Sequence, residues 1–374
     1  MKGRESTVRL GVLGCADIAW RRVLPAVVDN PRTELVAIAS RDPEKARGFA
    51  ERFDCDAVTG YERLLEREDL DAVYIPLPVA LRREWVARAL TRDLHVLSEK
   101  PLTTDRAGAG ELVDLARSRG RVLRENFGFL HHSQQSRVGE MLDSGAIGRV
   151  CSVDSEFGVP RRPDHDIRYD PGLGGGALLD VGVYPLRLAQ YFLGTGLRVR
   201  GAVLRHDPDR GVDVGGSVLL ADAHGASARL AFGIGVQYRN SYAIWGTRGT
   251  LSVDRAFTPP ADMRPVLRLR EGQREETIEV EADHQFANVL GDFAAAIEFG
   301  ERPDVPESIL DLARLLDEVR RAAGEPLPVP TLTSRGAAER APRERGPSSP
   351  EGDGHASPRT DVGPPPGNPV RPGV

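Results

Sequence analysis

One group of side chains suited to proton transfer lies in the tripeptide Glu99-Lys100-Pro101, directly after the apolar stretch His95–Ser98. A lysine at such a place can donate a hydrogen bond or a proton to a substrate oxygen. Burial would lower its pKa and the neighbouring Glu99 would raise it, so the sequence leaves its charge open. Pro101 fixes the turn, in a cis or a trans peptide. The alternative is an ordinary surface lysine in a turn.

A second group follows three consecutive glycines, Gly174–Gly176, in the stretch GGGALLDVGVYP. Asp180 and Tyr184 are four residues apart, so we expect them on one face of a helix. Aspartate is a poor helix-interior residue, and the glycines allow close approach of the backbone to another group. A carboxylate and a phenol that project together can bind a polyol and exchange protons with it. The alternative is a carboxylate–phenol hydrogen bond within a domain interface.

The segment 8–19, VRLGVLGCADIA, runs from an expected strand into an expected helix. A helix begun this way directs free N–H groups at a pyrophosphate, and small residues let the backbone approach it. The G-x-G-x-x-[GA] fingerprint maps onto Gly14, Ala16 and Ala19, with alanine in place of the second glycine. The alternative is an ordinary βα turn. The position of the segment 8–19 at the first expected strand favours dinucleotide binding over this alternative.

The next expected strand ends in Ala39-Ser40-Arg41-Asp42. Sites selective for NAD commonly place an acidic residue there to bind the ribose 2′-hydroxyl. A hydroxyl and a guanidinium instead suit a 2′-phosphate. We therefore expect NADP, with Asp42 as the N-cap of the following helix. The alternative for Arg41 is a solvated loop residue.

Alternating strand and helix signals fill the first ~125 residues and predict a parallel sheet covered on both faces. The expected strands are Val8–Leu13, Glu34–Ser40, Asp71–Pro76, His95–Ser98 and Val122–Asn126, and the expected helices are Ile18–Asp29, Pro43–Phe53, Leu81–Leu90 and Thr104–Arg119.

The pattern changes after residue 150. Apolar and polar residues alternate over Val150–Pro160, which is typical of a half-buried strand. Further strands are expected near 217–222, 227–233, 238–245 and 250–254, with hairpin turns at His224-Gly225 and Arg248-Gly249. The helix Gly174–Leu193 is expected on one face of this largely antiparallel sheet.

These patterns predict an α/β domain with a parallel sheet at 1–125 and a second domain with a largely antiparallel sheet at 126–330. The segment 334–374, rich in proline and glycine, is expected to be disordered. The 50 basic and 55 acidic residues give a net charge of −5, which argues against a nucleic-acid partner. No apolar run is long enough for a membrane span, and no signal peptide is expected. Three scattered cysteines form no disulfide framework or metal motif, so the cytoplasm is the expected compartment and no metal is expected.

The combined motifs resemble the glucose–fructose oxidoreductase/inositol dehydrogenase/MocA family, over residues 8 to about 325. The stretches that carry the resemblance are Gly11–Gly14 with Ile18-Ala19, Ser40–Asp42, Glu99–Pro101, Ser144–Gly148, Gly174–Tyr184 and Gly246–Leu251. Within the family, GCADIAWRR, GYERLLERED, LHH, DIRYD and DRAFTPP are similar to segments of the NDP-hexose 3-ketoreductases of deoxysugar biosynthesis.

The resemblance implies an α/β Rossmann domain at 1–125 followed by an α+β domain with an open sheet at 126–330. It also implies that nicotinamide lies between the two domains, with Lys100 and Tyr184 as catalytic residues. It implies a substrate site made of Lys100, Asp180, Tyr184, Tyr238 and Thr258. It implies an NADP(H) site made of Cys15, Ala16, Asp17, Ile18, Ala19, Ser40, Arg41, Tyr61, Leu77, Pro78, Glu99, Lys100, Arg168 and Asp180. The chain departs from the family pattern at Arg82, where many relatives have histidine. Tyr184 also replaces a common histidine, as it does in the sugar 3-ketoreductases.

We therefore expect an NADPH-dependent reductase of the C3 keto group of a nucleotide-linked 3,4-diketo-2,6-dideoxyhexose, with dTDP as the expected nucleotide. One alternative is a dehydrogenase of a free sugar or inositol. Another is a non-catalytic NADP-binding regulator, against which the potential proton donors argue. An open sheet face favours a homo-oligomer formed through the second domain.

Overall fold

The computed structural model describes residues 7–299, 306–325 and 327–328. The predicted tail, 334–374, lies outside them. The first part of the chain forms a six-stranded sheet in the order β3-β2-β1-β4-β5-β6, with every neighbouring pair parallel. Its strands are β1 (Val8–Leu13), β2 (Thr33–Ser40), β3 (Asp56–Thr59), β4 (Ala72–Ile75), β5 (His95–Ser98) and β6 (Leu123–Glu125). The strand order reverses between β1 and β4, and sheets of this kind bind ligands beyond the carboxyl ends of the strands at that point.

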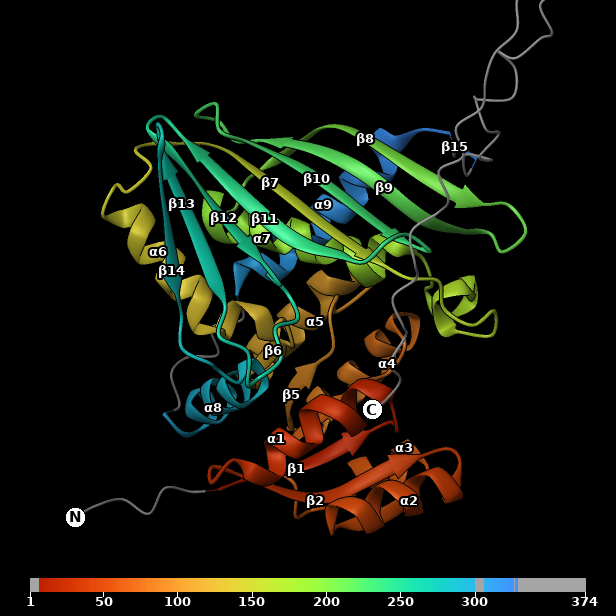
Figure 1. The fold of residues 1–374 in the computed structure, drawn as a ribbon. Coiled ribbons are helices and arrows are strands. Elements are labelled where there is room, and N and C mark those ends of the chain that lie inside the picture. Colours follow the sequence, from red (N-terminus) through yellow and green to blue (C-terminus); the bar gives the residue numbers. More distant parts are fainter. Residues whose placement is uncertain (1–6, 300–305, 326, 329–374) are drawn as a thin grey trace, which may run out of the picture. The chain divides into compact units, whose positions relative to one another are not determined.

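Helices cover both faces of this sheet (Figure 1). They are α1 (Leu24–Asp29), which continues from the π-helical turn η1 (Ala19–Val23), α2 (Pro43–Phe53), α3 (Tyr61–Leu65), α4 (Val79–Thr91) and α5 (Arg106–Arg119). On one face, Val73 and Val96 pack with Val86 of α4 and Val113 of α5. On the opposite face, α1 packs together with α8 (Gln285–Glu298), which follows the second sheet in the sequence. The sheet is therefore buried on both sides, as its apolar strands predict.

The second sheet has nine strands in the order β14-β13-β12-β11-β7-β10-β9-β8-β15. Its pairs are antiparallel except β7–β10 and β8–β15, which confirms the predicted open, mostly antiparallel sheet. The strands are β7 (Val150–Val159), β8 (Arg198–Asp207), β9 (Val212–Ala221), β10 (Ser227–Ile234), β11 (Arg239–Gly246), β12 (Gly249–Asp254), β13 (Val266–Glu271), β14 (Arg274–Glu279) and β15 (Leu327–Pro328).

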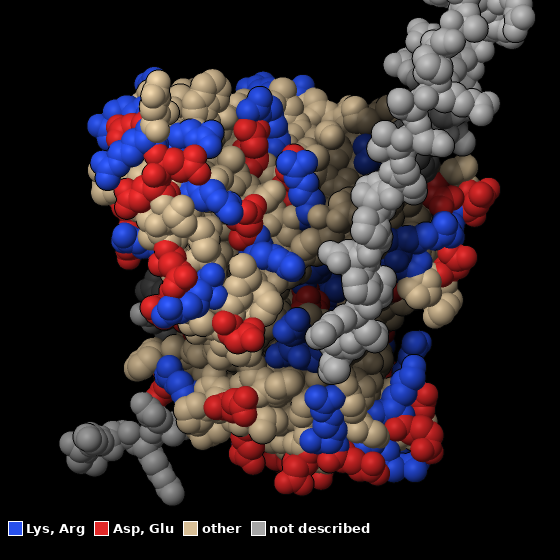
Figure 2. All heavy atoms as spheres, viewed as in Figure 1, with Lys and Arg blue, Asp and Glu red and all other residues tan. Residues whose placement is uncertain are grey.

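One face of this sheet packs on helices, and the other carries ion pairs. Helices α7 (Val183–Leu193) and α9 (Glu307–Ala323) pack beneath it, and α6 (Ser133–Asp143) lies near the β14 side (Figure 1). Outward side chains pair across strands, as in Arg229–Asp154 and Arg268–Asp254. Figure 2 shows such basic and acidic side chains interspersed.

The structure corrects the predicted helix Gly174–Leu193. Gly174 and Gly176 have φ values of 76° and 119°, so the glycines form turns rather than helix. A π-helical segment, η5 (Leu178–Gly182), follows, and the α-helix begins only at Val183. The expected elements also omit several that exist, namely β3, β8, β13, β14, β15, α3, α6, α8 and α9. In the described part of the chain, no helix combines the length and apolarity needed to cross a membrane.

Candidate active site

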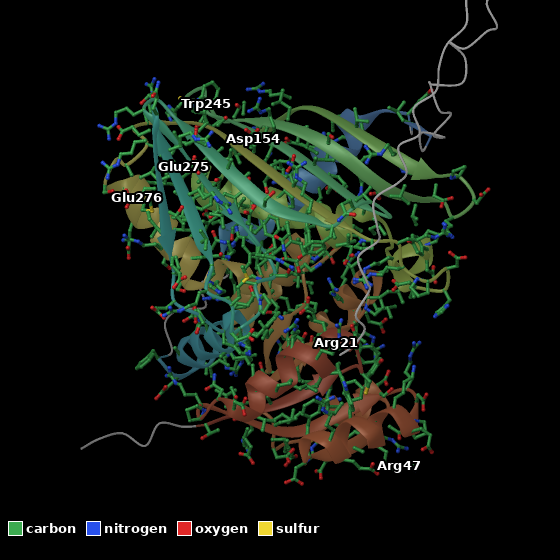
Figure 3. All side chains as sticks on the ribbon, in the orientation of Figure 1. Arg21, Arg47, Asp154, Trp245, Glu275 and Glu276 are labelled. Atoms are coloured by element: carbon green, nitrogen blue, oxygen red, sulfur yellow. The ribbon has the colours of Figure 1, made fainter. Side chains whose placement is uncertain are left out.

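A cleft of about 670 Å³ lies where the carboxyl ends of β1, β4 and β5 face the second sheet. The side chains that line it include most of the residues selected from the sequence. From the first sheet come Ala16, Asp17, Ile18, Leu77, Pro78, Glu99 and Lys100, and from the second part come Arg168, Asp180, Tyr184, Tyr238 and Thr258. Arg21, which also lines the cleft, lies between the two sheets in Figure 3.

The turn after β1 has the geometry expected of a phosphate-binding loop. Gly14 has a φ of 119°, and a Cβ there would lie 2.8 Å from Leu77 Cδ2, so glycine is needed. The helical run begins at residue 17, and its first-turn amides lack intrahelical acceptors. Ala16 and Ile18 line the cleft at this point. An anion fits here.

Two residues predicted at this turn point elsewhere. The Cys15 thiol lies 3.5 Å from the carbonyl oxygen of Lys45, and burial raises its pKa to about 11. Ala19, the first residue of η1, is fully buried. Neither lines the cleft, so each supports the turn through packing.

The predicted 2′-phosphate site lies at the end of β2, separate from the cleft lining. Asp42 accepts the backbone N–H groups of Glu44 and Lys45, so its carboxylate is the expected N-cap. Arg41 is exposed and forms no ion pair with any carboxylate in residues 7–299, 306–325 and 327–328. Burial raises the pKa of the neighbouring Tyr61, and the positive charge of Arg41 opposes that rise. The Arg41 guanidinium, which hydrogen-bonds Tyr61 but no carboxylate of the described residues, therefore suits a phosphate better than a ribose hydroxyl.

Lys100 lines the cleft and reaches across it to Asp180. Its Nζ donates to the carbonyl oxygen of Asp180 at 2.7 Å and lies 3.6 Å from Asp180 Oδ1. The side chain is 10% exposed, which excludes the surface-lysine alternative. Burial lowers the pKa of Lys100, while the carboxylates of Asp180 and Glu99 oppose the shift. The Lys100–Pro101 peptide is cis.

Asp180 joins this lysine to an arginine. Arg168 Nε donates to Asp180 Oδ2 at 2.5 Å. Burial alone would raise the pKa of Asp180, but the charges of Lys100 and Arg168 outweigh it and hold that pKa below its usual value. Asp180 is therefore ionised and stabilises the ammonium form of Lys100.

The ring of Tyr184 lies beneath Lys100, with Nζ 4.6 Å from its centroid, a cation–π distance. The rings of Phe127, Phe129, Phe157 and Phe257 surround it at centroid distances of 5.8, 5.8, 5.0 and 5.5 Å. Burial, together with the charges of Glu99 and Asp180, raises the pKa of Tyr184. No described residue hydrogen-bonds its hydroxyl, so the carboxylate–phenol alternative is absent here. The phenol is neutral and firmly oriented.

Tyr238 and Thr258 meet on the side of the cleft formed by the second sheet. Their hydroxyls are 2.9 Å apart, and Asn240 Nδ2 donates to both, at 2.9 and 2.7 Å. Arg255 Nη1 also reaches the Tyr238 hydroxyl, at 3.2 Å. These hydroxyls form a fixed polar surface that fits hydroxyl or carbonyl groups of a ligand.

Sequence reasoning missed several side chains that line the cleft or support it. Arg22, Asn126, Arg162, Asp166 and Gln285 line it, and so does Arg82, which the sequence marked only as a departure from the family pattern. Asn126 Nδ2 and the Tyr74 hydroxyl both donate to Glu99 Oε1, at 2.6 and 2.9 Å, and so orient Glu99 beside Lys100. Asn126 follows the last parallel strand, a position that could have signalled its role.

Comparisons with known proteins place these features in context. A family model described as the oxidoreductase family with an NAD-binding Rossmann fold matches residues 8–127. The model of the GFO/IDH/MocA C-terminal domain matches residues 136–252.

Curated relatives and solved structures agree with these matches. A dTDP-3,4-didehydro-2,6-dideoxy-alpha-D-glucose 3-reductase from Actinomadura kijaniata is 50% identical over 317 residues, which are 84% of this chain and 96% of that protein. A reductase of the same name from Streptomyces violaceoruber is 51% identical over 334 residues, 86% of this chain and 98% of that protein. The crystal structure of KijD10, a 3-ketoreductase from Actinomadura kijaniata in complex with NADP and TDP-benzene, has a TM-score of 0.84 at 49% identity and covers 87% of this chain and 100% of that one.

Proposed function

Because the chain belongs to the glucose–fructose oxidoreductase/inositol dehydrogenase/MocA family of oxidoreductases, we propose that it reduces the C3 keto group of a dTDP-linked 3,4-diketo-2,6-dideoxyhexose with NADPH. The observation that carries the proposal is the buried ammonium of Lys100 between an ionised Asp180 and the face of Tyr184. About 50% identity to reductases of that substrate, over most of both chains, supports the assignment.

The residues present fit NADP(H). The free amides at the start of the helical run, next to Ala16 and Ile18, suit the pyrophosphate, and Arg41 with Ser40 suits the 2′-phosphate. Leu77 and Pro78 flank the path from this turn to Lys100. When bound, NADPH supplies the hydride that a carbonyl reduction requires.

The protein's part in the reaction is to place and protonate the C3 oxygen. Lys100 donates a hydrogen bond to the carbonyl oxygen and then a proton to the alkoxide that develops there. Asp180 maintains the charge of Lys100, and Arg168 fixes Asp180. Tyr184 orients the sugar as an auxiliary donor, while Tyr238 and Thr258 contact the sugar nucleotide.

The experiment that tests the proposal is NADPH oxidation with freshly generated 3-keto nucleotide sugars, with free sugars and inositol as controls. Turnover with the nucleotide-linked 3,4-diketo-2,6-dideoxyhexose supports it. Turnover with free sugars alone favours the dehydrogenase alternative, and NADPH binding without turnover of any sugar favours the regulator.

The outer face of the second sheet supports a further proposal, a homo-oligomer. Trp245 is 56% exposed on it, and Val203 and Leu219 are 40% and 43% exposed. Self-association would cover these side chains. Sedimentation of the full chain and of Trp245→Glu tests this proposal. The native chain should sediment as an oligomer and Trp245→Glu as a smaller species, and a monomeric native chain would contradict the proposal.

The free thiols of Cys15, Cys55 and Cys151 are consistent with a cytoplasmic location, which we also propose.

A further inference from the structure

The peptide group between Pro101 and Leu102, which begins one residue after Lys100, is held on one side by the buried Arg82 and on the other by the carboxyl group of Glu125. Its carbonyl oxygen accepts from Arg82 Nη1 at 2.5 Å. Its N–H donates to Glu125 Oε1 at 2.7 Å. Hydrogen bonds with a charged partner are about twice as strong as neutral ones. This peptide is therefore the most firmly fixed part of the turn that carries Lys100.

Arg82 connects two loops of the cleft. Besides Pro101, it binds the carbonyl oxygen of Leu77 through Nε, at 2.7 Å. The loop after β4 and the turn after β5 are thus joined by one guanidinium that is 8% exposed. The planar guanidinium presents several donors in fixed directions, which neither lysine nor histidine reproduces.

Glu125 lies behind the turn and does not line the cleft. Its Oε2 is buried without a hydrogen-bond partner. The charged groups that face it are Arg187 from α7, Arg82 from α4 and Lys100. Helices α5 and α9 contribute the apolar residues Ala109, Ile309, Leu312, Ala313 and Leu316. A carboxyl group in this position does not reach the cleft, and its hydrogen bond acts on the reaction through the peptide that it holds.

We propose that Arg82 and Glu125 are positioning residues for Lys100, acting as a charged clamp on the Pro101–Leu102 peptide. This inference rests on the proposed reductase function, in which Lys100 must lie within hydrogen-bond reach of the C3 oxygen. A misplacement of about 1 Å costs on the order of 100-fold in rate. The clamp therefore governs turnover rather than ligand affinity.

The clamp is also sensitive to pH. Burial raises the pKa of Glu125 from 4.5 to about 7, against the opposing charges of Arg187, Arg82 and Lys100. Above that pKa, the ionised carboxylate holds the Leu102 N–H with a charge-assisted bond. Below it, the bond is neutral and weaker. Turnover is therefore expected to fall as the pH drops through about 7.

The first test compares Glu125→Gln and Glu125→Leu with the wild type. Glu125→Gln keeps an acceptor oxygen without charge, so its kcat should be about tenfold lower above neutral pH and should lose the acidic limb near pH 7. Glu125→Leu should lose about 100-fold in kcat. The Kd of NADPH and the KM of the sugar should stay within about twofold, since Glu125 touches neither.

Glu111→Gln is the matched control, because Glu111 is 59% exposed and pairs with Arg83 on the outside of the same region. It should retain the wild-type kcat and pH profile. If Glu125→Leu does not fold, the kcat and the pH profile of Glu125→Gln alone test whether Glu125 positions Lys100. A wild-type kcat and an unchanged acidic limb in Glu125→Gln would overturn the proposal.

The second test replaces Arg82 and needs no sugar. Arg82→His introduces the histidine that many relatives have at this position and removes the hydrogen bonds to the carbonyl oxygens of Leu77 and Pro101. Arg83→His, at the neighbouring exposed position, is the control. Hydrogen exchange of the Leu102 amide should be about tenfold or more faster in Arg82→His and Glu125→Leu than in the wild type. Unchanged exchange would overturn the clamp. If the wild type binds NADPH but reduces no 3-keto nucleotide sugar, the proposed function fails while the exchange result still decides the clamp.

Discussion

Replacement of Lys100 by methionine tests the division of labour between the two candidate proton donors. The substitution keeps the length of the side chain but removes the ammonium that lies 2.7 Å from the Asp180 carbonyl oxygen. General acid catalysis contributes ~10²–10⁴ in rate, and a preorganised donor to a developing oxyanion ~10²–10³. Because one ammonium supplies both effects, they do not multiply fully. We expect a loss of at least ~10⁴ in kcat, which is about 5.5 kcal/mol of transition-state stabilisation.

Tyr184→Phe should cost less. The ring is held by four phenylalanine rings, so the substitution leaves the packing intact. The neutral hydroxyl of Tyr184 can donate one hydrogen bond to the developing alkoxide, but it brings no positive charge. A loss of about 10- to 100-fold in kcat is expected, the range for one hydrogen bond to a charged group.

The assay is steady-state NADPH oxidation with the nucleotide-linked diketo sugar, together with NADPH titration by fluorescence. Both variants should still bind NADPH, since neither residue lies at the phosphate-binding turn. If Tyr184→Phe were inactive while Lys100→Met remained active, Lys100 could not be the essential proton donor, and Tyr184 would have that role instead.

Three further changes probe the cofactor site, the charge of Lys100 and the buried acid. Arg41→Ala should weaken NADPH binding by ~1.5–3 kcal/mol and leave NADH nearly unchanged, and equal losses in isothermal titration would refute the 2′-phosphate assignment. Asp180→Asn removes a charge that raises the pKa of Lys100, so the basic limb of the kcat–pH profile should move to lower pH; a shift to higher pH would contradict this. The unfolded pKa of Glu125 is 4.5 and its folded pKa is about 7, so the acid destabilises the fold as pH rises through that window. The melting temperature of Glu125→Gln relative to the wild type should therefore increase from pH 5 to pH 8, reflecting a free-energy change on the order of 3 kcal/mol, and a constant difference would refute the shift.

The parallel sheet was predictable because continuous apolar strands such as Asp71–Pro76 alternate with amphipathic helices. The second sheet was recognised from the period-2 alternation of Val150–Pro160 and from the glycine turns between the later strands. By contrast, β14 carries mostly charged residues, because it is the edge strand of the sheet and buries little. Its strand character depends on pairing with β13, which in turn pairs with β12, and no local pattern reveals these pairings.

The candidate site was predictable only in part. The positions of Lys100 and Asp180 followed from a strand end and from an unexpected aspartate beside glycines. The role of Asp180 did not, because the π-helical turn η5 directs its carboxylate to Lys100 and Arg168 rather than to Tyr184. Arg82 and Glu125 meet at one peptide from elements far apart in sequence, so only the tertiary structure brings them together.

The central claim is that the C3 carbonyl receives hydride while Lys100 protonates its oxygen. The most direct measurement is the position of the label after turnover of the nucleotide-linked 3,4-diketo sugar with NADPH deuterated at C4 of the nicotinamide, followed by NMR of the product. We expect deuterium at C3 of the sugar in the wild-type product and almost no deuterated product with Lys100→Met. Deuterium at C4 of the sugar, or reduction that continues unaltered in Lys100→Met, would contradict it.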